Sequence, residues 1–340
     1  MLWYEMTGRD SDVVVSSRVR LARNLEDYPF GERLNEPSAK EIIEKVKAVF
    51  EDEDSYKFIN FSSLDPVSRA AEADRHKVSS EFARKKTPTA LIESENDQVY
   101  ILVLEEDHLR LQSIKAGFAL DEAFEAVKNA DKLIDSKLKL AYDEKLGYLT
   151  HCPTNLGTGM RASVMLHLPA LTYAGGIRTL QSQLSKIGLT IRGMWGEGSA
   201  ADGCLYQVSN QITLGMSEED IISKLSGVCE KVVEQERNLR EKLKTSDNGK
   251  LTDRIMRAYG TMLYATLVDS AELFRLYADV RLGASIGIIE GVKLSNLDKM
   301  LISGMAGVIM DENEGVKTPA ERDRARADMI RRALAGGKES

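Results

Sequence analysis

The stretch VVVSSRVRLARN at residues 13–24 decides how this chain folds. It begins with three β-branched residues, which favour a strand, and runs without a break into three arginines. Successive side chains of a strand point to opposite faces, so Arg18 and Arg20 face the same side. Two neighbouring cations need a counter-anion, and phosphate matches the planar guanidinium group. The stretch therefore predicts a strand that contributes to a phosphate site.

Three further arginines, Arg110, Arg161 and Arg192, stand beside strand ends or glycine-rich loops. The chain has neither a GxxxxGK[ST] loop nor the motif set of the protein kinases. A nucleotide would therefore be held by a cage of arginines. The alternative for any one of these arginines is an ordinary solvated surface position.

Acidic residues follow the same segments. Glu105, Glu106 and Asp107 end the apolar strand predicted at 98–104, where three carboxylates repel one another unless a metal or a cationic substrate lies nearby. Glu197 lies between two glycines, in a backbone free to project it into a site. The alternatives are a solvated strand end and a mobile surface turn.

The periodicity predicts an α+β domain at residues 1–245 and a small all-α domain at residues 251–340. Further strands are expected at 57–61, 188–195 and 205–211, and helices at about 121–142 and 176–187. Capping boxes predict helix starts, with the pairs Ser38 and Glu41, Ser217 and Asp220, and Thr318 and Glu321. From Leu251 onward the chain is predicted to be almost entirely helical.

Composition excludes several classes of protein. The 340 residues are 43% hydrophobic and 29% charged, which is ordinary for a soluble globular protein. A net charge of −7 argues against bulk nucleic-acid binding, and no apolar run approaches the roughly 20 residues that span a membrane. Three distant cysteines predict neither disulfides nor a metal site, so we expect a reducing, cytoplasmic setting.

Four motifs together resemble the catalytic domain of the phosphagen (guanidino) kinases. They are SSRVRLARN at 16–24, EEDHLR at 105–110, CPTNLGTGMRASV at 152–164 and RGMWGEGS at 192–199. The resemblance covers roughly residues 12–245 and implies an antiparallel sheet flanked by helices. Phosphagen kinases carry a helical N-terminal domain that helps enclose a small guanidino substrate, and we expect this domain to be missing here. This difference and the added C-terminal region resemble the bacterial protein arginine kinases of the McsB type.

The resemblance implies transfer of the γ-phosphoryl group of ATP, with Mg²⁺, to arginine side chains of proteins. By resemblance, Glu197 is the catalytic base, Glu106 binds the guanidino group, and Cys152 tunes that site. Arg110, Arg161 and Arg192 stabilise the transferred phosphoryl group as catalytic residues. The nucleotide is expected to contact Ser16, Ser17, Arg18, Val19, Arg20, His76, Arg110, Arg161, Ala162, Ser163, Val164, Met165, Arg192, Gly193, Met194, Trp195, Gly196 and Glu197. No metal-binding side chains are expected.

The C-terminal region adds an RDxxRA motif, which in the resembling kinases is associated with binding phosphoarginine as an allosteric signal. Its residues here are Arg322, Asp323, Arg324, Ala325, Arg326 and Ala327. The resemblance also implies a homodimer or higher oligomer, a zinc-binding activator protein, and a Clp-type protease that receives the marked proteins during stress. Two alternatives stay open: a kinase for free arginine or another small guanidino compound, and an inactive phosphoarginine-binding adaptor.

Overall fold

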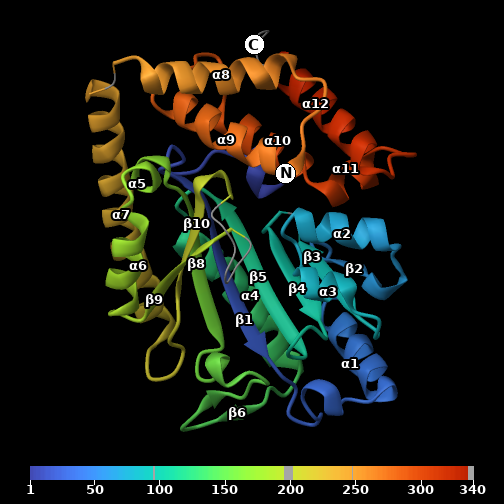
Figure 1. Ribbon diagram of the computed structural model, residues 1–340. Coiled ribbons are helices and arrows are strands. Elements are labelled where there is room, and N and C mark those ends of the chain that lie inside the picture. The colour runs from blue at the N-terminus through green and yellow to red at the C-terminus, as the bar shows by residue number, and fades with distance from the viewer. Residues whose placement is uncertain (95, 195–201, 247, 336–340) are drawn as a thin grey trace.

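A computed structural model describes residues 1–94, 96–194, 202–246 and 248–335. Its main feature is an eight-stranded sheet in the order β2-β3-β4-β5-β1-β8-β10-β9, in which every neighbouring pair is antiparallel (Figure 1). The strands are β1 Val14–Arg23, β2 Lys57–Ile59, β3 Ala90–Ser94, β4 Val99–Val103, β5 Leu109–Ala116, β8 Met160–His167, β9 Leu189–Gly193 and β10 Leu205–Asn210. A separate small ribbon pairs β6 Tyr142–Asp143 with β7 Gly147–Tyr148.

One face of this sheet is apolar and covered by helices. Val19 and Leu21 of β1 point to it, and both are buried. Helices α1 Glu36–Val49, α4 Leu120–Lys137 and α7 Glu218–Ser246 pack on this face. Because side chains alternate along a strand, the arginines at positions 18 and 20 are directed to the opposite face.

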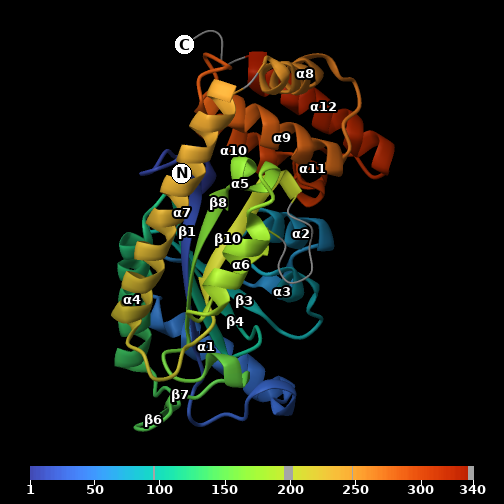
Figure 2. The same ribbon diagram turned by 60° about the vertical axis from the view of Figure 1, so that its left-hand side comes forward.

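The opposite face is covered at two places and hollow between them. Near β3 and β4 it is covered by α2 Pro66–Asp74 and α3 Ser80–Arg84, around a small core that includes Phe82 and Tyr100. At the other end lie the C-terminal helices α8 Lys250–Tyr264, α9 Ser270–Ser285, α10 Leu294–Ser303, α11 Ala306–Glu312 and α12 Pro319–Ala335 (Figures 1 and 2). Two short helices, α5 Pro169–Tyr173 and α6 Ile177–Ser185, connect β8 to β9.

A buried arginine joins the C-terminal helices to the N-terminal segment. Arg281 of α9 is fully buried, and its guanidinium donates to Asp298 of α10 at 2.8 Å. The same group donates to the carbonyl oxygens of Ser11 and Asp12 at 2.9 and 3.1 Å. A buried charge is tolerated when it is paired and hydrogen-bonded. Arg281 therefore fixes the helices against the segment that enters β1.

A second contact joins α11 to α2 beside the hollow. Arg75 donates to Asp311 at 3.1 Å and to Glu312 at 3.2 Å. The carboxylate of Asp74 accepts the backbone N–H of Gly307 at 2.7 Å. These bonds connect the C-terminal helices to α2, which covers the sheet near β3 and β4.

The predicted fold class is confirmed: an antiparallel sheet flanked by helices is followed by a helical C-terminal region. The boundary between residues 245 and 251 stays a prediction. The Ser217 and Thr318 capping boxes are confirmed. Each hydroxyl accepts the backbone N–H of the acid three residues later, and the backbone N–H of the serine or threonine donates to that acid's carboxylate. Among the described helices, none is both long and apolar enough to cross a bilayer.

The helix start predicted at Ser38 is wrong. Helix α1 begins earlier, at Glu36, and its N-cap is Asn35, whose side chain accepts the backbone N–H of Ser38 at 2.9 Å. Pro37 stands in the first turn, where its missing N–H costs nothing and its fixed φ suits a helix. Asparagine and proline together therefore start the helix ahead of the serine.

Candidate active site

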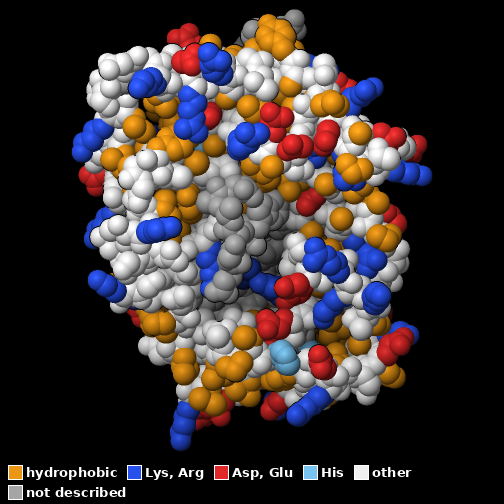
Figure 3. All heavy atoms as spheres, viewed as in Figure 1, with side chains coloured by type: hydrophobic (Ala, Val, Ile, Leu, Met, Phe, Trp, Pro, Cys, Tyr) orange, Lys and Arg blue, Asp and Glu red, His pale blue; other side chains and the backbone are white. Residues whose placement is uncertain are grey.

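The hollow face carries the arginines because the strand register brings them together. Arg20 of β1 lies directly opposite Arg161 of β8, and Ala22 of β1 lies opposite Arg110 of β5. Arg18 lies two residues before Arg20 on β1, opposite Ser163 of β8. Figure 3 shows the molecule hollowed near the middle of this face, with basic side chains inside the hollow and acidic side chains at its rim.

These arginines are held close to one another at an electrostatic cost. Burial, together with Arg110, lowers the pKa of Arg18 to about 10. Burial, Arg110, Arg18 and Arg161 lower the pKa of Arg20 well below its ordinary value. Like charges directly opposite each other destabilise a sheet, so an anion bound here would relieve the repulsion. The arrangement is that of a polyanion site.

A cavity of about 150 Å³ joins the arginines to the acidic residues. Arg20, Arg110 and Arg161 line one side, and Glu105, Glu106 and Asp107 line another. Cys152 completes the wall; it is half-buried, and its Sγ lies 3.0 Å from Thr154 Oγ1. Three of the four sequence-predicted motifs therefore contribute residues to one cavity.

The three acids lie on a tight turn that starts at Leu104. The backbone of Leu104 is left-handed, with φ of 68°, and its N–H donates to the carbonyl oxygen of His108 at 2.7 Å. A branched side chain in this conformation is strained, by roughly 1–3 kcal/mol. The ammonium group of Lys85 donates to the carbonyl oxygens of Leu104, at 2.8 Å, and of Glu105. Lys85 therefore holds the strained turn in place.

Glu105 points inward and is fully engaged. It accepts hydrogen bonds from Arg110 Nη1 at 2.6 Å and from Ser79 Oγ at 2.7 Å. It also accepts the backbone N–H of Glu106 at 2.7 Å. Burial alone would raise the pKa of Glu105, but Arg110 and these donors outweigh it and lower the pKa. Glu105 acts as the partner that positions Arg110.

Asp107 also points inward, whereas Glu106 is exposed. Asp107 accepts hydrogen bonds from Asn24 Nδ2 and from the backbone N–H of His151, both at 2.6 Å. Partial burial, Asp107 and Glu105 raise the pKa of Glu106. A cation beside Glu106 would reverse that effect. Of the three acids, Glu106 is the one placed to meet a cationic ligand.

Apart from the arginines of the first cavity, several predicted nucleotide residues line a second cavity and others have side chains directed away from the hollow. Ser16, Arg18, His76, Met165 and Met194 line a second, narrow cavity of about 10 Å³. Residues of the C-terminal helices, Tyr277, Asp298, Leu301 and Ile302, close it from the other side. His76 has a positive φ of 62°, and burial and Arg18 lower its pKa to about 3.

The other group has side chains directed away from the hollow. Val19, Ala162 and Val164 are fully buried in the core on the helix-covered face. Ser17 bonds to the carbonyl oxygen of Gly117 at 2.9 Å. Any contact of these four with a nucleotide would come from the backbone. Ser163, by contrast, is opposite Arg18, on the hollow face.

Arg192 of β9 lies opposite Gln207 of β10 and is half-buried. Gly193 and Met194 follow it and are buried. Trp195, Gly196 and Glu197 lie outside the described residues, so the structure gives no position for the predicted base.

The RDxxRA residues occupy the first turns of α12. Arg326 is 1% exposed and donates to the carbonyl oxygens of Gly304 and Val268, both at 2.7 Å, and to Asp323 at 2.8 Å. Ala327 is buried beside it, and Ala325 is half-buried. Arg322 is half-buried and Arg324 is exposed. Arg326 thus organises the helical region, while Arg322 and Arg324 face the surface.

The sequence analysis did not identify Lys85, Ser79 or Trp3 as part of the site. Lys85 lies in an ordinary Lys-Lys pair and Ser79 caps a five-residue helix, so neither carries a motif. Trp3 lies 73 residues before His76 in the sequence, yet their ring centroids are 6.0 Å apart. Only the tertiary structure brings these residues to the site.

Comparison with known proteins gives two family matches. Residues 38–239 match the family of the ATP:guanido phosphotransferase C-terminal catalytic domain. Residues 248–340 match the protein-arginine kinase McsB C-terminal domain.

Curated relatives extend over nearly the whole chain. The protein-arginine kinase of Brevibacillus brevis is 41% identical over 98% of this chain and 94% of its own length. That of Clostridium acetobutylicum is 39% identical over 98% of this chain and 99% of its own.

Solved structures share the fold at lower identity. The duplicated taurocyamine kinase of Schistosoma mansoni with bound transition-state analogue components has a TM-score of 0.62 and 23% identity over 79% of this chain. This chain spans 40% of that protein's length. Lombricine kinase has a TM-score of 0.60 and 23% identity, covering 71% of this chain and 70% of its own.

Proposed function

Since the chain belongs to the ATP:guanido phosphotransferase family and, within it, to the protein-arginine kinases, we propose that it transfers the γ-phosphoryl group of ATP to arginine side chains of proteins. One observation carries the proposal: a single cavity brings Arg20, Arg110 and Arg161 to the exposed carboxylate of Glu106. This pairing gives a phosphate chain and a guanidinium neighbouring places to bind.

The arginines supply the charge that phosphoryl transfer needs. In the transition state, negative charge spreads over the equatorial oxygens of the transferred group. Fixed guanidinium groups stabilise that charge without reorganising, and removal of one such contact commonly costs on the order of 10²–10³ in rate. Glu105 supports this role, because its bond to Arg110 fixes one of these groups.

Glu106 is the carboxylate that we assign to the substrate guanidinium. A guanidinium has a pKa above about 12 and must be oriented and deprotonated before its nitrogen attacks phosphorus. Glu105 and Asp107 are occupied by protein donors, whereas Glu106 is exposed at the cavity. Glu197, which matches the family's loop glutamate, is proposed as the base, and Cys152 as a residue that tunes the guanidino site.

The donor set also fits ATP with Mg²⁺. Magnesium in such sites is held largely by substrate phosphates and water, and the arginines that line the cavity give those phosphates a place to bind. When bound, the ion would neutralise phosphate charge. Arg18 and Arg192 would extend the cage along the phosphate chain. By the family resemblance we place the base of the nucleotide beside His76, Met165 and Met194. The narrow cavity that they line would have to widen, because its volume of about 10 Å³ holds only about one water molecule.

The finer expectations rest on the family resemblance. They comprise phosphoarginine binding at the RDxxRA motif, a homodimer or higher oligomer, a zinc-binding activator, and delivery of marked proteins to a Clp-type protease in the stress response of the cytoplasm. The surface positions of Arg322 and Arg324 support the first of these. Arg326 would contribute by holding α12 in place.

The test is direct phosphorylation of an arginine-rich protein by the purified chain with Mg-ATP. Modified sites are mapped by mass spectrometry under non-acidic conditions, because the N–P bond is labile in acid. We expect phosphate on arginine, and a loss of about 10²-fold or more in rate for Glu106→Gln and Glu197→Gln. Glu51→Gln, at an exposed position outside the cavity, serves as the matched control.

Other outcomes would redirect the assignment. Transfer to free arginine in preference to the protein would return the chain to the small-substrate guanidino kinases. Binding of phosphoarginine without any transfer, in the presence of an activator, would indicate an adaptor.

A further inference from the structure

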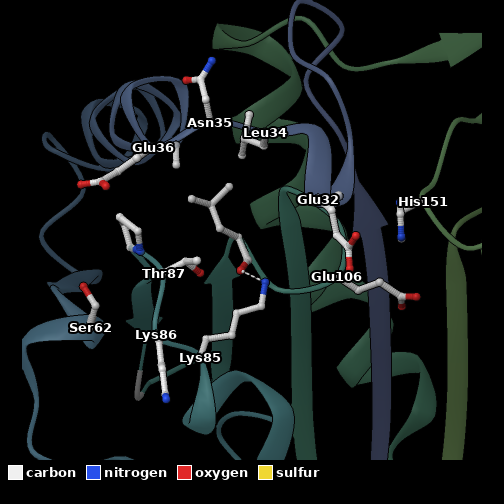
Figure 4. A pocket seen from close by; sticks show the side chains of 14 residues that line it. Glu32, Leu34, Asn35, Glu36, Ser62, Lys85, Lys86, Thr87, Glu106 and His151 are labelled. Atoms are coloured by element: carbon white, nitrogen blue, oxygen red, sulfur yellow. Dashed lines mark hydrogen bonds between the residues drawn. The ribbon is translucent and has the colours of Figure 1, made fainter.

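A groove much larger than the arginine cavity opens beside it. Its volume is about 770 Å³, within the range of about 300–1,000 Å³ typical of ligand sites. One wall is the start of α1 with the residues before it, including Glu32 and Leu34, and the other is the loop at Lys85–Pro88. Figure 4 shows Glu32, Glu106 and His151 together at one end of the groove.

The groove adjoins the arginine cavity, because Glu106 lines both. A target arginine whose guanidinium lies at Glu106 is still joined to its own polypeptide. That polypeptide has to leave the site along the surface next to Glu106, which is where the groove begins. Leu34, Ala39 and Leu104 give the groove apolar surface for side chains of such a segment.

We infer that this groove seats the polypeptide segment next to the target arginine, and that Glu32 favours a basic residue in that segment. The inference rests on the proposed function, since it names how the same site holds a protein substrate.

The charge of the groove supports a basic occupant. Glu32 is exposed and lies at the Glu106 end, so two carboxylates face the entry of the substrate. Lys85 does not offset them in full, because its ammonium group is turned to the carbonyl oxygens of Leu104 and Glu105. The side chain of Lys86 points away from Glu32 and Glu106 (Figure 4).

Glu36 lies at the far end of the groove and contributes less than Glu32 to its negative charge. Its carboxylate is paired with Lys40 one turn later, at 2.7 Å. Glu32 is therefore the residue whose charge a substrate would meet next to Glu106.

The experiment compares synthetic substrates with one arginine each. They are N-acetylarginine methylamide and nine-residue peptides in which alanine, lysine or glutamate residues flank a central arginine. For the wild type we expect a higher kcat/KM for the alanine peptide than for the blocked amino acid. Among the three peptides, we expect kcat/KM to be highest with lysine, intermediate with alanine and lowest with glutamate. An exposed ion pair contributes up to about 1 kcal/mol, so adjacent peptides in this order should differ up to about fivefold.

Two variants tie the effect to the groove. Glu32→Arg should reverse the order of the lysine and glutamate peptides. Thr87→Trp, at an exposed position on the opposite wall, should narrow the groove and abolish the gain with length. Glu44→Arg is the control, because Glu44 is exposed on α1 but outside the groove.

The outcomes separate the groove from the function. Equal kcat/KM for all nine-residue peptides, or an unchanged order in Glu32→Arg, would overturn the inference while arginine phosphorylation persists. If the wild type phosphorylates neither these peptides nor an arginine-rich protein, the proposed function itself fails.

Discussion

Three consecutive carboxylates in this chain have three different environments. Glu105 is bonded to Arg110 and Ser79, and Asp107 is bonded to Asn24 and the His151 amide. Glu106, between them, is exposed. The left-handed backbone at Leu104 sets this arrangement, because it turns the chain so that the outer two acids point inward. At the scale of single residues, the conformation of this turn thus leaves one of the three acids exposed.

Arg20→Gln tests the arginine cage. We expect kcat to fall by about 10²–10³-fold, because one charge contact to the transition state is lost. Thermal stability should not fall, since Arg20 is surrounded by Arg18, Arg110 and Arg161, and its buried Nε has no hydrogen-bond partner among the described residues. Circular dichroism melting beside steady-state kinetics measures both. A lower melting temperature with unchanged kcat would contradict this account, and the exposed Arg84→Gln is the control.

Lys85→Met tests the support of the strained turn. The variant keeps the length of the side chain but leaves the carbonyl oxygens of Leu104 and Glu105 without this donor. Loss of a buried donor costs about 1–3 kcal/mol, so the urea midpoint should fall and KM for the protein substrate should rise. Lys86→Met, at the exposed neighbouring position, should leave the urea midpoint unchanged. Equal midpoints for the two variants would show that Lys85 does not hold the turn.

Single residues of the site were predictable where they belong to motifs. The arginines of the cage follow from strand alternation and from four motifs in order, and the register brings Arg20, Arg110 and Arg161 together. Lys85 was not predictable, because its role depends on a contact with a turn 19 residues later in the sequence.

At the scale of elements, the α2–α11 contact depends on a residue without a side chain. A Cβ at Gly307 would lie 2.7 Å from a carboxylate oxygen of Asp74 and 2.8 Å from the backbone of Ala70. The helices can approach this closely because Gly307 presents only backbone. The same amide donates to Asp74, so the contact is both tight and polar.

Gly307→Ala should therefore separate α11 from α2 and destabilise the protein by about 1–3 kcal/mol, as other overpacking substitutions do. Gly260→Ala is a matched control in α8, where a Cβ would meet no atom within 4 Å. It should stabilise by about 0.5–1 kcal/mol, because alanine favours a helix over glycine. Urea denaturation of both variants gives the free energies of unfolding. A stabilised Gly307→Ala would mean that the helices are not in tight contact.

Elements with a strong sequence pattern were predicted, and several without one were not. Helix α7 and strands β1, β4 and β10 have clear caps or apolar runs. No clear pattern in the sequence indicated β3, which has five residues, or α11, which has seven. Segments of this length carry too little periodicity to distinguish them from loops. Their structure is decided by what they pack against.

At the scale of the whole molecule, two histidines with strongly lowered pKa values link stability to pH. Burial and neighbouring arginines lower the pKa of His76 to about 3 and that of His167 well below its ordinary value. The unfolded chain therefore takes up protons near pH 6.5 that the folded protein does not. Their contribution to stability is complete above about pH 6.5 and is lost as the pH falls.

We expect the free energy of unfolding to drop by about 1 kcal/mol for each histidine between pH 7.5 and 5.5. Urea titrations at the two pH values measure it. In His76→Asn, the drop in the free energy of unfolding should be smaller by the contribution of one histidine, because the asparagine side chain does not titrate. A drop that stays the same in this variant would assign the pH dependence to other groups.

The position of Trp3 gives the molecule an optical reporter of its own. The chain contains two tryptophans, and Trp3 is buried at the junction of the sheet and the C-terminal helices, 6.0 Å from His76. Indole emission depends on the polarity around the ring and on nearby groups that quench it. In a Trp195→Phe background, the emission of Trp3 would follow events at that junction in real time and without a dye. Binding of a nucleotide beside Arg18 would then change the emission of Trp3. Movement of α10 would change it as well.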